Sequence, residues 1–240
     1  VMRYRKVGKH ALEVSEISLG TGDTAGGMVY GTTAQQHELM AGALDLGVNL
    51  FDCSPDYGKG SSEVNVGRVL QDLGASDAKI ITKVEIMEED LGRIAQKVEQ
   101  SINDSLLRLR RQKVDVVMLH NPVRAVRNPN IRQWMRQPPE DVLYQVLPAL
   151  LKAKAAGKCD YLGLACESAD TKAITPIMET GEIAMINAWF NMTNPTALRA
   201  MSGYPEQQDY EGMIALAEKH GAAVSVVRPL AGGALTDSFV

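Results

Sequence analysis

The chain has 240 residues, enough for one large domain with a full hydrophobic core or for two small ones. Hydrophobic residues make up 45% of it and charged residues 22%, a balance typical of a globular protein in water and not of a disordered one. The net charge of −4, without a dense block of Lys and Arg, argues against a nucleic-acid or anionic-membrane surface. We therefore expect neither nucleic acid nor membrane among its partners.

The cysteines indicate a reducing compartment. Cys53, Cys159 and Cys166 lack metal-ligand spacing, and an odd count does not suit a disulfide framework. No run of residues approaches the length of a membrane span, and the first residues carry no signal-peptide pattern. We predict a cytoplasmic protein without a metal site.

Strand-like and helix-like segments alternate along the chain. Residues 4–14 predict a small hairpin, with Gly8 and Lys9 at its turn, that plugs the bottom of a barrel. Short apolar runs predict strands near residues 16–20, 48–52, 79–84, 114–119, 161–165, 183–189 and 223–227. Amphipathic spacing predicts helices over residues 34–46, 62–73, 91–109, 142–156 and 209–220. Gly47, Gly74, Gly157 and Gly221 follow four of these helices, as is typical of the loops between helices and strands.

The spacing of the strands indicates the fold class. It averages about 34 residues, the size of one βαβ unit. A series of such units favours a parallel barrel over an open sheet, because a (β/α)₈ barrel typically needs about 250 residues. We predict a single α/β domain over residues 1–240, a TIM barrel whose eighth strand and C-terminal segment are absent from this chain. No linker or low-complexity tract indicates a domain boundary.

Three successive predicted strands end in polar residues that would be buried. Asp52 ends one strand, Lys83 closes the next and His120 closes the third, while Tyr57 lies in the short loop after Asp52. A lone charged or polar group at the tip of an apolar strand is unfavourable unless it is paired or used. Each residue taken alone also fits a structural role, as a loop cap, a surface aromatic, a rim lysine or a turn histidine. Because barrel strands end on one face, the four together predict a catalytic site.

A dinucleotide-binding motif competes with this interpretation. Residues 20–25, GTGDTA, fit the G-x-G-x-x-A fingerprint, and Asp52 lies roughly where an acid that binds ribose would follow. The fingerprint should open directly into a helix, but residues 26–31 intervene. An open Rossmann sheet also leaves Tyr57, Lys83 and His120 unexplained, so it is the weaker alternative.

An ordered series of motifs runs through nearly the whole chain. It comprises RYRKVG at residues 3–8, VSEISLGTG at 14–22, FD at 51–52, YGKGSSE at 57–63, Gly67, ITK at 81–83, Asp115, LHNP at 119–122 and RPLAGG at 228–233. In this series the chain resembles the aldo-keto reductase family. The resemblance implies a (β/α)₈ barrel and a catalytic tetrad that maps onto Asp52, Tyr57, Lys83 and His120.

The resemblance also implies an oxidoreductase that reduces aldehydes or ketones to alcohols, reversibly, with a hydride from nicotinamide and a proton from Tyr57. Tyrosine alone is a poor acid, with a pKa of about 10. A nearby Lys83 ammonium would favour the phenolate and make Tyr57 a better donor, while Asp52 would pair the lysine. His120 would donate an N–H to the carbonyl oxygen.

The implied cofactor is NADPH, with NADH as the alternative. The family's binding positions map onto Gly20, Thr21, Asp52, Ala165, Cys166, Asn187, Val227, Arg228, Leu230 and Gly232. The chain departs from the family at four of them. Ala165-Cys166 replaces the usual Ser-Asn, Asn187 replaces a Gln, and Val227 replaces the aromatic residue that stacks on nicotinamide. The residues that would bind the adenosine 2′-phosphate are expected after Val240.

The expected partner is a small carbonyl substrate, and the oligomeric state stays open. Loops at the same face predict a substrate pocket that includes Met28, Tyr30 and Trp134, although Trp134 also fits a role in packing its loop onto the barrel. The departures in the cofactor positions support a second hypothesis. In that hypothesis the chain is a catalytically weak or inactive relative that binds nucleotide and acts as a regulatory protein.

Overall fold

The computed structural model describes residues 1–127, 135–166, 170–203 and 209–237. Within these ranges a seven-stranded sheet runs in chain order, and every neighbouring pair is parallel. Its strands are β3 (Leu19–Gly20), β4 (Leu50–Asp52), β5 (Lys79–Val84), β6 (Val114–Leu119), β7 (Cys159–Cys166), β8 (Ile183–Trp189) and β9 (Ala223–Val227). The predicted parallel arrangement is confirmed.

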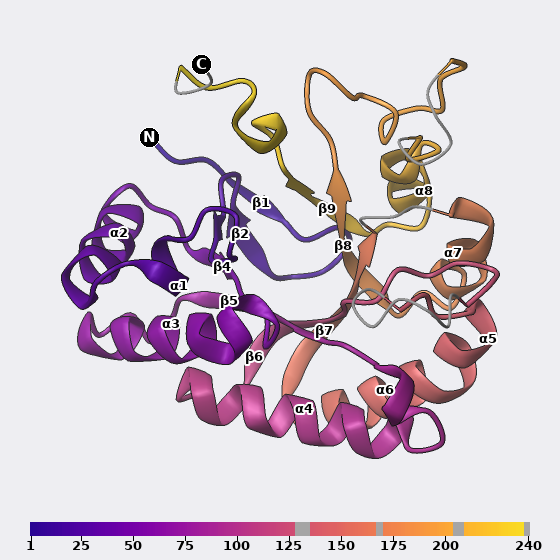
Figure 1. Cartoon of the computed structure of the whole chain (residues 1–240), viewed down its shortest axis with the longest axis horizontal. Coiled ribbons are helices and arrows are strands. Elements are labelled where there is room, and N and C mark those ends of the chain that lie inside the picture. Colours follow the sequence, from indigo (N-terminus) through magenta and orange to yellow (C-terminus); the bar gives the residue numbers. More distant parts are fainter. Residues whose placement is uncertain (128–134, 167–169, 204–208, 238–240) are drawn as a thin grey trace.

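Helices cover the outside of this curled sheet (Figure 1). They are α1 (Gly27–Tyr30), α2 (Thr33–Asp45), α3 (Ser61–Asp72), α4 (Ile94–Leu109), α5 (Pro139–Asp141), α6 (Leu147–Ala155), α7 (Thr171–Met178) and α8 (Met213–Lys219). A π-helical turn, Val142–Val146, joins α5 to α6. The main hydrophobic core lies between the helices and the sheet, as expected for a β/α barrel.

Two short helices, α1 (Gly27–Tyr30) and α5 (Pro139–Asp141), were not predicted. The longer helices differ from the prediction at three further places. Helix α4 begins at Ile94 and not at residue 91, because Leu91 is extended. It ends at Leu109 as predicted, and Arg110, the residue that caps it, adopts φ 55 without being glycine. Helix α7 was not predicted, since it is short and contains Pro176. Helix α8 begins at Met213, because Glu211 and Gly212 both have positive φ.

A hairpin precedes the large sheet. Strand β1 (Tyr4–Lys6) pairs with β2 (Glu13–Ser15) in antiparallel fashion. Val7 and Val14 are buried in a second cluster, whose other buried members come from the inside of the sheet: Leu50, Ile81, Val116, Met118, Ala184 and Met185. The hairpin therefore plugs the interior at the N-terminal ends of the strands, as predicted.

The turn of the hairpin depends on glycine. Gly8 has φ +55, and a Cβ built there would lie 2.2 Å from the carbonyl oxygen of Gly221. The Lys9 N–H donates a hydrogen bond to the same oxygen at 3.2 Å. A side chain at position 8 would push the turn away from the loop before β9.

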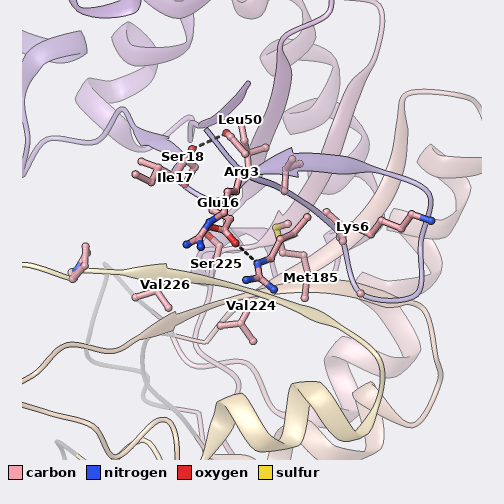
Figure 2. Close-up of a pocket in the computed structure, with 17 residues that line it drawn as sticks. Arg3, Lys6, Glu16, Ile17, Ser18, Leu50, Met185, Val224, Ser225 and Val226 are labelled. Carbon is pink, nitrogen blue, oxygen red and sulfur yellow. Dashed lines mark hydrogen bonds and ion pairs between the residues drawn. The ribbon is translucent and has the colours of Figure 1, made fainter. Parts of the chain in front are cut away.

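The first and last strands of the sheet, β3 and β9, are not neighbours in the described structure. A groove of about 780 Å³ opens on this side, lined by the hairpin and by residues 223–226 of β9. Figure 2 shows Glu16 and Arg3 on one wall and Val224 and Val226 on the other. Arg3 Nε donates to Glu16 at 2.6 Å, which places an ion pair at the edge of the groove.

No helix of the described ranges has both the length and the apolar content that crossing a membrane requires. Over the same ranges, no group of three or more His, Cys, Asp and Glu side chains is arranged to hold a metal ion.

Candidate active site

The four residues singled out from the sequence come together at the C-terminal ends of neighbouring strands. Asp52 is the last residue of β4, Lys83 is the penultimate residue of β5, and His120 directly follows β6. Tyr57 begins a 3₁₀ turn, Tyr57–Gly60, shortly after β4. Lys83 has no exposed surface, His120 is 2% exposed and Asp52 6% exposed, whereas Tyr57 is half-buried.

The Lys83 ammonium forms the centre of the site. It donates to Asp52 Oδ1, to the Cys53 carbonyl oxygen at 2.9 Å and to the Tyr57 hydroxyl at 3.0 Å. These contacts account for the three N–H bonds of an ammonium group. Burial alone would lower the pKa of Lys83, but the Asp52 carboxylate and the Tyr57 phenol outweigh burial and raise it. The lysine is therefore positively charged next to Tyr57.

Asp52 also connects opposite sides of the barrel. Its second oxygen, Oδ2, accepts a hydrogen bond of 2.9 Å from Asn187 Nδ2 on β8. Asn187 is 1% exposed, and its carbonyl oxygen Oδ1 has no hydrogen-bond partner among the described residues. A buried amide oxygen without a donor is unfavourable. The site therefore contains an acceptor suited to a ligand that carries an N–H group.

His120 lies against Tyr57. The two rings meet edge to face, with centroids 5.9 Å apart and an interplanar angle of 84°. Nδ1 of His120 is 3.2 Å from Ser54 Oγ. Burial, and then the charge of Lys83, hold the pKa of His120 well below its usual value. The ring is therefore neutral near pH 7 and can donate from only one of its nitrogens.

Local backbone contacts hold Tyr57 in place. Its N–H donates to the Ser54 carbonyl oxygen at 3.2 Å. The next residue, Gly58, has φ 57 and donates its N–H to Asp23 at 3.0 Å. Gly22 lies against the phenol ring, since a Cβ built there would be 3.3 Å from it. These contacts leave Tyr57 little room to turn away from Lys83.

The predicted cofactor positions divide into two groups. Gly20 pairs with Asp52 at the end of β3, and Ala165 and Cys166 end β7, with Ala165 opposite Asn187. Thr21 is buried and its hydroxyl donates to the Asp52 carbonyl oxygen at 2.8 Å. These residues border the tetrad.

The remaining cofactor positions follow the last strands. Val227 ends β9 opposite Trp189, and the Arg228 guanidinium lies 4.1 Å from the centre of the Trp189 ring. Leu230 is 53% exposed, and Gly232 has φ 69. This segment offers an exposed cation beside an aromatic surface.

The residues predicted to line a substrate pocket lie in different surroundings. Met28, on α1, is 1% exposed and packs in the main core. Tyr30 is 74% exposed, and its hydroxyl donates to Asp23 at 3.2 Å. Trp134 lies outside the described residues.

Two contributors to the site were missed in the sequence. The backbone carbonyl of Cys53 accepts from Lys83, and the side chain of Ser54 contacts His120. A backbone carbonyl leaves no signal in a sequence. Ser54, a polar residue between Asp52 and Tyr57, was visible but fitted an ordinary loop equally well.

The chain matches the model of the aldo/keto reductase family over residues 16–240. It is 28% identical to a candidate voltage-gated potassium channel subunit beta from Schizosaccharomyces pombe, in an alignment covering 98% of this chain and 64% of that protein. It is 30% identical to L-galactose dehydrogenase from Arabidopsis thaliana, covering 68% of this chain and 48% of that protein. The chain thus spans less than two thirds of the length of these relatives.

Solved structures share the fold. The holo form of an aldo-keto reductase from Bacillus halodurans superposes with a TM-score of 0.74 at 22% identity, covering 100% of this chain and 70% of that one. Glycerol dehydrogenase from Gluconobacter oxydans superposes with a TM-score of 0.73 at 24% identity, covering 99% of this chain and 66% of that one. At these identities the likeness concerns the fold alone.

Proposed function

Because the chain belongs to the aldo/keto reductase family, we propose that it is an oxidoreductase that reversibly reduces aldehydes or ketones to alcohols. The observation that carries the proposal is the contact of the buried Lys83 ammonium with both Asp52 and the Tyr57 hydroxyl. A structural lysine would need a counter-ion but would not need a half-buried phenol as a second partner.

In this mechanism Tyr57 gives its proton to the oxygen of the reduced carbonyl. The phenolate that remains is stabilised by the Lys83 ammonium at 3.0 Å. Asp52 keeps that ammonium charged and in place, and Asn187 keeps the Asp52 carboxylate oriented. Neutral His120, next to the Tyr57 ring, donates an N–H to the substrate oxygen where negative charge develops.

The hydride would come from a bound nicotinamide cofactor, since no side chain can supply one. The residues present fit such a group. The unpartnered oxygen of Asn187 is an acceptor for a carboxamide N–H. It lies beside the tetrad, because the same side chain donates a hydrogen bond to Asp52. The exposed Arg228 is a candidate phosphate ligand. NADPH is the proposed cofactor and NADH the alternative.

We propose the substrate class, the location and the partners on similar grounds. The substrate is a small carbonyl compound, the location is the cytoplasm, and nucleic acid and membrane are not partners. They rest on composition and on family membership.

The first test is nucleotide binding, followed by turnover. The protein is titrated with NADPH and with NADH while nucleotide fluorescence is followed, and then assayed with a panel of aldehydes. Tyr57→Phe is expected to bind nucleotide as the parent does and to lose at least about 100-fold in kcat, because it lacks the proton donor. Tyr144→Phe, which alters a 77% exposed tyrosine of the π turn, serves as the matched control. Full activity in Tyr57→Phe would refute the mechanism.

A regulatory nucleotide-binding protein is the second candidate. The observation that favours it is the pair Ala165-Cys166, whose side chains offer no amide to hold a cofactor. The relative with a channel-subunit name is aligned over 98% of the chain and is compatible with this reading. Tight nucleotide binding without turnover of any carbonyl would select this candidate.

A further inference from the structure

Ser54 is a buried residue of the site that the proposed chemistry has not used. It has no exposed surface, and it occupies the loop between Asp52 and Tyr57. Its hydroxyl oxygen lies 3.2 Å from Nδ1 of His120 and accepts the backbone N–H of Asp56, also at 3.2 Å. The hydroxyl thus has two neighbours, one of which can only be a donor.

The direction of the contact with His120 follows from these neighbours. The Asp56 N–H cannot accept the hydroxyl hydrogen of Ser54. Within the described ranges, Nδ1 of His120 is the acceptor that remains in reach of that hydrogen. If Nδ1 carried a proton instead, the hydroxyl hydrogen would be buried without an acceptor, which is unfavourable. The geometry therefore favours a hydroxyl that donates to an unprotonated Nδ1.

A neutral imidazole carries one proton, so an unprotonated Nδ1 requires a protonated Nε2. Nε2 is the ring nitrogen that Ser54 does not contact. We propose that Ser54 is a positioning residue that holds His120 in the Nε2–H tautomer, so that the ring presents a donor to the substrate oxygen. The part of this inference that concerns substrate rests on the proposed function, whereas the tautomer does not.

The tautomer is tested by NMR of the imidazole nitrogens in the full chain without substrate. The chain has four histidines, and the His120 signals are those that disappear in His120→Gln. The parent protein is expected to show a protonated Nε2 and an unprotonated Nδ1. Ser54→Ala is expected to shift the signals toward a mixture of both tautomers. A protonated Nδ1 in the parent protein would overturn the inference.

Kinetics provide the second readout. Ser54→Ala is expected to lower kcat for carbonyl reduction by about tenfold, less than the 10²–10³-fold cost of deleting an oxyanion donor outright. The Kd for NADPH should stay at the parent value, because Ser54 acts through His120. Ser105→Ala is the matched control, since it also removes one hydroxyl from a fully buried serine but on α4, where Ser105 contacts Arg108. It should leave both the tautomer and kcat unchanged.

The two readouts separate this inference from the proposed function. If the parent protein has the Nε2–H tautomer and Ser54→Ala loses it, but no carbonyl is reduced, the enzyme assignment fails and the role of Ser54 toward His120 stands. If carbonyl reduction occurs and Ser54→Ala keeps the parental tautomer and kcat, the role of Ser54 is refuted and the enzyme assignment stands. A folding defect in Ser54→Ala leaves the parental tautomer as the deciding measurement.

Discussion

At the scale of single residues, the described part of the chain buries the Lys83 ammonium completely and surrounds it with oxygen atoms. Two of these oxygens belong to side chains, Asp52 and Tyr57, and one to the backbone of Cys53. The arrangement stabilises the charge of Lys83 at the point where Tyr57 would release a proton. The Asp52 carboxylate in turn needs Lys83 as its counter-ion, since it is nearly as buried as the lysine.

The dependence of Asp52 on Lys83 predicts a non-additive pair of substitutions. Lys83→Met is expected to lower the free energy of unfolding by about 3–5 kcal/mol, because it leaves a buried carboxylate without its cation. Adding Asp52→Asn should recover part of this loss, since the double variant buries no unpaired charge. Urea unfolding, followed by circular dichroism, measures the free energy of unfolding of the single and the double variant. Losses that simply add would show that the two groups do not act as a pair.

His120 predicts how stability depends on pH. The unfolded chain protonates this residue near its ordinary pKa of about 6.5, while the folded protein keeps it neutral to lower pH because of burial and Lys83. Below that pKa the unfolded state binds more protons, so stability falls as the pH falls. Lowering the pH from about 7.5 to about 5.5 is therefore expected to reduce the free energy of unfolding by about 1.4 kcal/mol through His120.

The control for this pH dependence is His120→Gln, which has no titrating group at this position. Its free energy of unfolding should decrease less than that of the parent between the two pH values, by about the stated 1.4 kcal/mol. His10, whose pKa is also lowered by burial, is present in both proteins and cancels. If the free energy of unfolding fell equally with pH in the parent protein and in His120→Gln, His120 would not be the source of this pH dependence.

At the scale of elements, α3 and α4 approach each other closely at Gly67. A Cβ built on Gly67 would lie 2.6 Å from the Leu109 carbonyl oxygen and 2.7 Å from that of Arg108, both at the end of α4. The adjoining Glu63 of α3 accepts a hydrogen bond of 2.7 Å from Arg108 Nε. The contact thus combines a close backbone approach with a partly buried ion pair, which orients the two helices that flank β5.

The close approach predicts opposite effects for two glycines in helices. Gly67→Ala is expected to destabilise the protein by about 1–3 kcal/mol, because the backbone of α4 must move to admit a methyl group. Gly42→Ala in α2 should stabilise it by about 0.5–1 kcal/mol, because no atom lies within 4 Å of the added Cβ and alanine favours helix. Thermal and urea unfolding of the two variants give the comparison. A Gly67→Ala protein as stable as Gly42→Ala would show that the helices do not meet there.

At the scale of the whole molecule, the sheet curls around a buried polar centre without pairing its first and last strands in the described structure. The hydrogen bond between Asp52 and Asn187 joins β4 to β8 across the interior. The hairpin joins the opposite end, where Ser15 and Asn49 exchange hydrogen bonds of 2.7 and 3.1 Å. Strand β9 lines the groove of Figure 2.

Much of this arrangement was available from the sequence. The alternation of apolar runs and amphipathic segments determined the order and approximate bounds of the strands, because burial of each sheet face and helix face imposes its own period. Gly47 and Gly74, with φ 89 and 67, end α2 and α3 as expected, since that conformation favours glycine. Asp52, Lys83 and His120 were recognisable because polar groups rarely end apolar runs without a partner.

Other features depended on contacts between residues far apart in the chain. The burial of Met28, the hydrogen bond from Asn187 to Asp52 and the contact between Ser54 and His120 each depend on packing that no local pattern encodes. Helix α7 escaped prediction because it is short and contains Pro176, although its buried residues Ala173, Ile174 and Ile177 belong to the main core. The sequence alone determined the fold class and the chemical types at the site, because these follow from periodicity and from the cost of burying charge. Only the tertiary structure decided which atoms meet, because directional hydrogen bonds depend on the relative positions of separate strands.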